Sequence, residues 1–167
     1  MLEKYAIENI LFLDIETVPE VASFSDLDEI KQELFAHKTA YQRKEEITAE
    51  AFYDRAGIWA EFGKIICISV GYFTYKNGER QFRITSFHGD EGKLLQEFSN
   101  LLNTHFNSPQ QLLCGHNAKE FDFPFIARRM VINDIAVPLK LDLIGKKPWE
   151  VPHLDTMELW KFGDYKH

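Results

Sequence analysis

The segment 63–88 constrains the fold more than any other part of the sequence. Two β-rich runs, 65–73 and 81–87, flank the dipeptide Asn77-Gly78. Asn-Gly favours a type I′ hairpin turn, because both central residues of that turn need a positive φ. The sequence therefore predicts an antiparallel hairpin, and the fold must contain a sheet built around it.

Other strands and helices are expected on both sides of this hairpin. The apolar run 9–16 is typical of a buried central strand, which Pro19 ends because proline cannot donate to a strand ladder. The remaining expected elements are helices around 26–38 and 48–56 in an acidic insertion over 20–62, a helix over 91–106, a strand over 111–115, a helix over 119–132, and a strand at 153–155 followed by a helix over 156–162. This order predicts an α/β fold in one domain, with a mixed β-sheet flanked by α-helices.

Composition is that of a globular chain. Of the 167 residues, 45% are hydrophobic and 27% are charged, which excludes a disordered protein. No apolar run approaches the roughly 20 residues that a membrane span needs, and the N-terminus has no pattern of a secretory signal. Cys67 and Cys114 fall in predicted buried strands, so we expect small core residues in a reduced, cytoplasmic protein with no membrane partner.

The net charge of −7 is unevenly distributed. Residues 1–118 carry 11 Lys and Arg against 18 Asp and Glu, whereas residues 119–167 carry 8 of each. An acidic protein is not expected to bind nucleic acid over its whole surface. A polyanion is therefore expected to bind to residues 119–167 and not to residues 1–118. The alternative for most of these charges is an ordinary solvated surface.

Asp14 and Glu16 form the first candidate site. They lie two apart at the end of the predicted strand, so both side chains leave the same face. Two carboxylates held close together repel each other, and a hard divalent cation with oxygen ligands would offset that repulsion. The alternative is a pair that simply faces solvent at the sheet edge.

A third carboxylate, Asp122, follows the predicted strand 111–115 through Gly115-His116-Asn117. Pro124 fits an early helical position, which places Asp122 near a helix N-terminus. A negative charge is favoured there by about 0.3–1 kcal/mol, so a simple helix-terminus role is the alternative to metal binding.

Together the two segments resemble a known family. Asp14-Ile-Glu16-Thr17, followed by Asn117-x3-Phe121-Asp122-x-Pro, is similar to the first two motifs of the DEDD superfamily of 3′–5′ exonucleases. The likeness is to the proofreading domains of family-B DNA polymerases and to stand-alone bacterial relatives. It covers the order of elements in the whole chain apart from the 20–62 insertion. It implies a ribonuclease H-like fold and a site for two Mg²⁺ or Mn²⁺ ions.

The resemblance also implies roles for individual residues. Asp14 would bridge both ions, Glu16 would hold one and Asp122 the other. Thr17, Asn117 and Phe121 would contact the 3′ end of a single strand, with DNA as the expected substrate and RNA as the alternative. For Phe121, core packing is an equal alternative. Hydrolysis of the terminal phosphodiester bond would follow a two-metal mechanism.

The third motif of the family, Tyr or His followed four positions later by Asp, is absent from the 167 residues. We therefore expect the C-terminal part of the domain to lie beyond His167, and this chain to be weakly active or inactive. Asp155 is expected to act as a cap or as a support for the site. General-base assistance alone contributes about 10²–10⁴-fold, which sets the scale of the expected loss.

Three other functions were weighed against the exonuclease. A haloacid-dehalogenase-type phosphatase needs Asp at the second position of the first motif, where Glu16 stands, and a later acidic pair that is lacking. A non-catalytic module on the same fold, binding nucleic acid or protein, stays open, as does an exoribonuclease. The two nucleases would differ in contacts to the 2′-hydroxyl, which no residue reveals.

Overall fold

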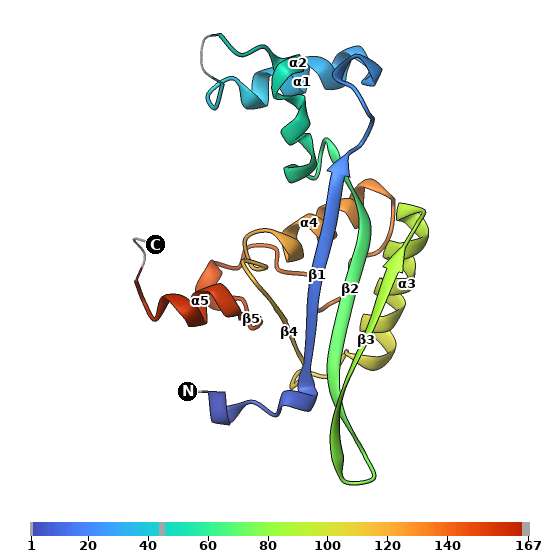
Figure 1. Ribbon diagram of the computed structural model, residues 1–167, viewed down its shortest axis with the longest axis vertical. Coiled ribbons are helices and arrows are strands. Elements are labelled where there is room, and N and C mark those ends of the chain that lie inside the picture. Colours follow the sequence, from blue (N-terminus) through green and yellow to red (C-terminus); the bar gives the residue numbers. More distant parts are fainter. Residues whose placement is uncertain (1, 44–45, 165–167) are drawn as a thin grey trace.

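The computed structural model describes residues 2–43 and 46–164. Within those ranges five strands form one mixed sheet in the order β3-β2-β1-β4-β5 (Figure 1). β1 pairs antiparallel with β2, which pairs antiparallel with β3, while β1–β4 and β4–β5 are parallel. The strands are β1 (Ile10–Pro19), β2 (Gly63–Lys76), β3 (Glu79–His88), β4 (Leu112–Gly115) and β5 (Leu154–Asp155). The α/β fold with a mixed sheet is confirmed.

The helices fall close to the predicted ranges. They are α1 (Glu29–Thr39), α2 (Ala49–Phe52), α3 (Glu91–His105), α4 (Asp122–Ile132) and α5 (Thr156–Lys161). Short 3₁₀ helices occupy Leu2–Lys4, Ile7–Asn9, Phe24–Asp26, Tyr53–Ile58 and Pro148–Glu150. Side-chain caps explain where some helices begin: the Asp90 carboxylate, for example, accepts a hydrogen bond from the Lys93 N–H at 3.0 Å. No helix in the described part of the chain is both long and apolar enough to cross a membrane.

The predicted hairpin is present. Asn77 has φ of 54° and Gly78 has φ of 83°, so both turn residues adopt the left-handed conformation that a type I′ turn requires. β2 and β3 pair without interruption from Cys67–His88 to Lys76–Glu79. Local turn chemistry therefore sets the register of this side of the sheet.

The two faces of β1 differ along their length. Leu11, Leu13 and Ile15 point into the main core, which α3 and α4 cover (Figure 1). On the opposite face Ile10 is buried, but Asp14 and Glu16 are exposed. The open face begins at Asp14, where the apolar run predicted to be covered on both sides ends, and it leaves the two acids accessible.

A bulge interrupts the pairing of β1 with β2 beside the acidic pair. Glu16 pairs with Cys67, but Thr17 pairs with Ile65, so Ile66 is the extra residue on β2. The bulge lets Ile65 and Ile68, an odd and an even position, both face the core. Cys67 is only half-buried, whereas the sequence predicted a buried strand residue, because it alternates with the core residue Ile68 and pairs with the exposed Glu16 on the open face.

The segment between β1 and β2 contains α1 and α2, as predicted, and lies beyond the carboxyl end of β1 (Figure 1). It has an aromatic cluster of its own, in which the buried Phe35 ring contacts Tyr53 and Phe62 with centroids 5.3 and 5.1 Å away. These contacts give the segment a local core, which uses several of the 14 phenylalanines in the sequence. The assignment of one domain with an insertion stays a prediction.

Candidate active site

Asp122 lies against β1 just beyond the point where β4 ends. The last β1–β4 pair is Phe12–Cys114, and three residues further on the Ile15 N–H donates a hydrogen bond to the Asp122 Oδ1 at 3.2 Å. This bond joins residues 107 positions apart in the sequence. Because Ile15 stands between Asp14 and Glu16, the bond brings the third predicted carboxylate to the strand that carries the other two.

The Asp122 carboxyl has an unusual environment for an acid. It is 3% exposed, and burial, reinforced by the negative charge of Asp14, raises its pKa to about 6 despite the hydrogen bond from Ile15. A buried carboxylate beside a second negative charge is electrostatically unfavourable near neutral pH. A bound cation or a proton would relieve this cost.

Asp14 and Glu16 project from the open face of β1. Within residues 2–43 and 46–164, neither carboxylate is hydrogen-bonded or ion-paired, and no group of three His, Cys, Asp or Glu side chains is arranged to hold a metal ion. The structure thus brings Asp122 next to Asp14, with Glu16 as its neighbour on the strand, but does not close a three-carboxylate cage. The donor chemistry nevertheless fits a hard divalent cation, because all three side chains offer carboxylate oxygens.

The loop between β4 and α4 is held by Asp155, at the end of β5. The Asp155 carboxylate accepts hydrogen bonds from the backbone N–H groups of Asn117 at 2.8 Å, Lys119 at 3.1 Å and Met157 at 2.9 Å. It thereby caps α5 and fixes the loop that leads to Asp122. The predicted capping role of Asp155 is confirmed.

Gly115 and Asn117 allow the backbone conformation of this loop and its close approach to β1. A Cβ on Gly115 would lie 2.5 Å from the Ala118 Cβ and 3.0 Å from the Leu13 carbonyl oxygen, so a larger residue would push the loop away from β1. Asn117 has φ of 59°, a left-handed conformation that asparagine tolerates better than most residues. Its Oδ1 is buried and has no hydrogen-bond partner among the described residues, so one polar atom of the loop is left unsatisfied.

The other two predicted contact residues lie nearby. Thr17 is half-buried on β1, directly after the bulge. Phe121 precedes α4, packs against the main core and has its ring centroid 5.4 Å from that of Phe125. Core packing therefore accounts for part of the Phe121 side chain, and its role toward a substrate stays a prediction.

Contacts between α5 and the same loop were missed in the sequence. The Thr156 Oγ1 donates to the Gly115 carbonyl oxygen at 3.2 Å and lies 3.0 Å from the His116 Nδ1. Lys119 pairs with Glu158 at 2.7 Å. These partners are about 40 positions apart, and no periodic pattern connects them, so no sequence signal could have indicated the pairs.

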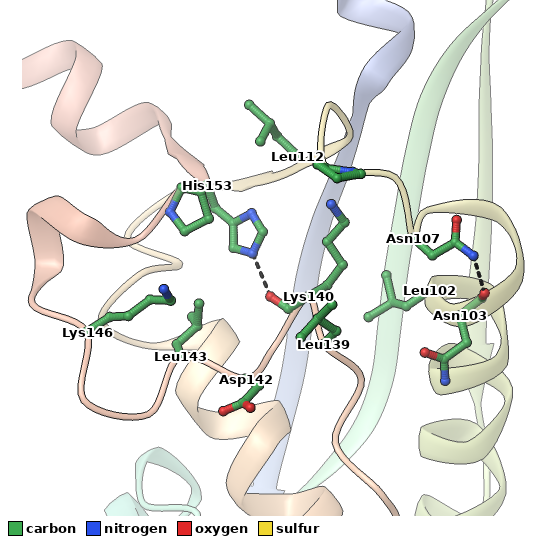
Figure 2. A pocket seen from close by; sticks show the side chains of 12 residues that line it. Leu102, Asn103, Asn107, Leu112, Leu139, Lys140, Asp142, Leu143, Lys146 and His153 are labelled. Carbon is green, nitrogen blue, oxygen red and sulfur yellow. Dashed lines mark hydrogen bonds between the residues drawn. The ribbon is translucent and has the colours of Figure 1, made fainter.

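A separate pocket of about 420 Å³ lies beside the first residues of β4, and none of the three candidate carboxylates lines it (Figure 2). Its two most buried polar side chains are already engaged. The Lys140 ammonium donates to the carbonyl oxygens of Ser108 and Gln111, and the His153 ring accepts from the Leu113 N–H and lies 2.7 Å from the Lys140 carbonyl oxygen. Burial lowers the pKa of His153 to about 4, so the ring is neutral and serves packing.

The family model of the RNase H superfamily matches residues 55–166. No curated protein matches the chain. Among solved structures, the family B DNA polymerase from the hyperthermophilic archaeon Pyrobaculum calidifontis is similar with a TM-score of 0.42 and 15% identity, over 81% of this chain and 12% of the polymerase chain.

The family match includes β2 to α5 and therefore both the loop at Asn117 and the start of α4 at Asp122. The mixed sheet with helices on its covered face is the arrangement that the resemblance implied. The chain belongs to the RNase H superfamily.

Proposed function

We propose that this protein is a metal-dependent 3′–5′ exonuclease that removes nucleotides from the 3′ end of single-stranded nucleic acid, with DNA as the expected substrate. The observation that carries the proposal is the hydrogen bond from the Ile15 N–H to Asp122. It supports convergence of the two motifs that resemble the DEDD exonucleases. Membership of a superfamily of nucleases supports the class of reaction.

Asp14, Glu16 and Asp122 are the residues that would hold Mg²⁺ or Mn²⁺. When bound, two such ions lower the pKa of a water molecule and stabilise the charge on the leaving oxygen of a phosphodiester. The raised pKa of Asp122 and the unpaired carboxylates of Asp14 and Glu16 are consistent with a site whose negative charge a bound cation would balance.

The remaining predicted residues would position the 3′-terminal nucleotide. The buried Oδ1 of Asn117 offers an acceptor for a sugar hydroxyl or a base N–H group. The partly exposed edge of Phe121 offers a surface for a base or sugar, and Thr17 lies on the strand that carries the acids. In this arrangement the chain orients the scissile bond over the open face of β1.

Metal binding is the first test. We expect millimolar Mn²⁺ to raise the melting temperature of the full chain and the variant Asp14→Ala to lose that rise. Glu97→Gln, an exposed acid on α3, is the control and should keep it. An equal shift in all three proteins, or no shift in the parent chain, would contradict the metal site.

Cleavage is the second test. A single-stranded DNA labelled at its 5′ end should shorten from the 3′ end in Mn²⁺ and stay intact in excess EDTA. The rate should be low, because this chain lacks the Tyr or His and the Asp of the third motif. Degradation in EDTA would rule out the proposed mechanism, and a matched RNA strand would show which sugar is accepted.

A second candidate is a non-catalytic module on the same fold that binds single-stranded nucleic acid, and the observation that favours it is that the described residues hold no group of three side chains arranged for a metal ion. This module would bind the same DNA with no shortening at any metal concentration. The two candidates are therefore separated by one assay in which binding and strand length are both recorded.

A further inference from the structure

A cationic groove runs along the outer side of α4. It is a pocket of about 310 Å³ whose lining includes Lys119, Arg128 and Lys146 together with apolar side chains such as Leu143. None of its lining residues is acidic within the described part of the chain. In a chain of net charge −7, a pocket lined by three cations and by no acid is a local exception.

The positive charge of this groove is only partly neutralised. Lys119 is 10% exposed on its side chain and pairs with Glu158. Neither Arg128 nor Lys146 has a hydrogen bond or ion pair from its side chain to a described residue. Glu61, whose charge interacts with Arg128, is itself paired with Lys38 at 2.8 Å. Two of the three cations are therefore available to an anion.

The groove adjoins a second pocket that reaches the loop leading to Asp122. This pocket of about 690 Å³ shares Lys119 and Pro148 with the groove and also contains Asn117. Its lining includes the acids Glu120, Asp155 and Glu158, so the positive charge is concentrated in the groove and not in this second pocket. Along α4, Asp122 and Arg128 are six residues apart, which corresponds to about 9 Å along the helix axis and about 120° around it. A strand with its end at Asp122 would therefore have to pass around α4 to reach the exposed Arg128.

An aromatic side chain stands in the connecting pocket. Trp149 lines it and is 76% exposed, which is unusual for so large an apolar ring. The Lys147 ammonium lies 5.3 Å from the centroid of that ring. Exposed aromatic rings beside cations are the surfaces on which single-stranded nucleic acids stack their bases.

We propose that this groove binds the phosphates of a single-stranded nucleic acid upstream of its 3′ end, through Lys119, Arg128 and Lys146, while Trp149 stacks on a base. The direction of the strand rests on the proposed exonuclease function, whereas the binding itself does not. Charge complementarity favours a polyanion, and the stacking surface favours a nucleic acid over an acidic protein.

The test measures binding in EDTA, so that metal plays no part. Fluorescence anisotropy would follow labelled oligo-dT of about four and about twelve nucleotides over a range of salt concentrations. The double variant Arg128→Gln/Lys146→Gln should weaken binding of the longer strand about tenfold at low salt and reduce the slope of log K against log salt by about 1.4, two phosphates at about 0.7 each. The shorter strand should lose less.

Matched variants distinguish the loss of charge in the groove from a general change in the net charge of the protein. Arg83→Gln/Lys76→Gln removes the same two charges from exposed positions of the β2–β3 hairpin and should change neither affinity nor slope. Trp149→Ala should weaken binding several-fold with an unchanged slope, because stacking releases no counterions. Equal losses in both double variants, or an unchanged slope in the groove variant, would overturn the proposal.

The outcomes also separate this inference from the proposed function. A groove variant with unchanged salt slope, in a chain that still shows the Asp14-dependent Mn²⁺ shift, would overturn the groove alone. Loss of the Mn²⁺ shift with an intact groove effect would overturn the exonuclease alone. Displacement by poly-glutamate at lower concentration than by oligo-dT would assign the groove to an acidic protein and overturn it as a nucleic-acid site.

Discussion

The Asp155 carboxylate accepts the backbone N–H of Asn117 at 2.8 Å, so the end of β5 holds the loop that leads to Asp122. Asp155 is 3% exposed and serves two further N–H groups, those of Lys119 and Met157. A single buried side chain thereby ties α5, β5 and the start of α4 together.

Asp155→Ala would remove all three of these hydrogen bonds. We expect the free energy of unfolding to fall by about 2–4 kcal/mol, because hydrogen bonds to a charged group contribute about 1.5–3 kcal/mol and their donors would be left buried. Urea denaturation measures this loss. Glu158→Gln, an exposed neighbour, should lose less than about 1 kcal/mol. A loss in Asp155→Ala no larger than in this control would contradict the capping role.

Asp122→Asn should stabilise the protein near neutral pH when divalent cations are absent. The pKa of Asp122 is raised from 3.8 to about 6, so the folded state binds more protons and the free energy of unfolding falls as pH rises through that window. A difference of about two pKa units lowers the free energy of unfolding by about 2–3 kcal/mol at pH values above the pKa of the folded state. The asparagine keeps an acceptor for the Ile15 N–H and removes the charge.

The measurement is urea denaturation in EDTA near pH 5 and pH 7. We expect the variant to be more stable than the parent chain at the higher pH by about 1–3 kcal/mol and the difference to shrink at the lower pH. A variant that is less stable at both pH values would show that the charged carboxylate is not costly in the fold.

Protonation of the buried His153 should destabilise the folded state at acidic pH. Burial lowers its pKa from 6.5 to about 4, so the unfolded state binds more protons below pH 6.5. The stability due to the neutral ring is complete above that value and is lost as pH falls toward 4, to a total of about 3 kcal/mol.

His153→Gln tests this effect, because glutamine can accept from the Leu113 N–H and donate to the Lys140 carbonyl without titrating. The free energy of unfolding should fall less steeply with acid in this variant than in the parent chain. His88→Gln changes an exposed histidine and should leave the slope as it is. Parallel pH profiles in all three proteins would refute the assignment.

Two variants of Asn117 distinguish an effect on stability from an effect on DNA binding. Asn117→Gly should be at least as stable as the parent chain, because glycine accepts the positive φ and the buried unpaired Oδ1 is removed. Asn117→Val should lose about 1–3 kcal/mol, since a β-branched residue is strained there. Thermal denaturation compares the two.

If Asn117 also contacts the 3′ end, both variants should bind single-stranded DNA more weakly than the parent chain, although only the valine variant loses stability. DNA binding that follows stability across the pair would indicate that Asn117 acts only through the loop.

Features that depend on a few neighbouring residues were predictable. The hairpin follows from the φ preferences of Asn77 and Gly78, and the shared face of Asp14 and Glu16 follows from the two-residue period of a strand. The start of α4 near Asp122 follows from Pro124. The fold class followed from the order of such elements.

The bulge at Ile66, the open face over Asp14 and the contacts of Asp155 were decided by tertiary structure. Each depends on which segments, tens of residues apart, pack side by side, and local preferences carry no information about that. The sequence by itself determined which three carboxylates are the candidates for a metal site. Only packing decided that Asp122 reaches β1, because one hydrogen bond across 107 positions requires β1, β4 and α4 to be assembled first.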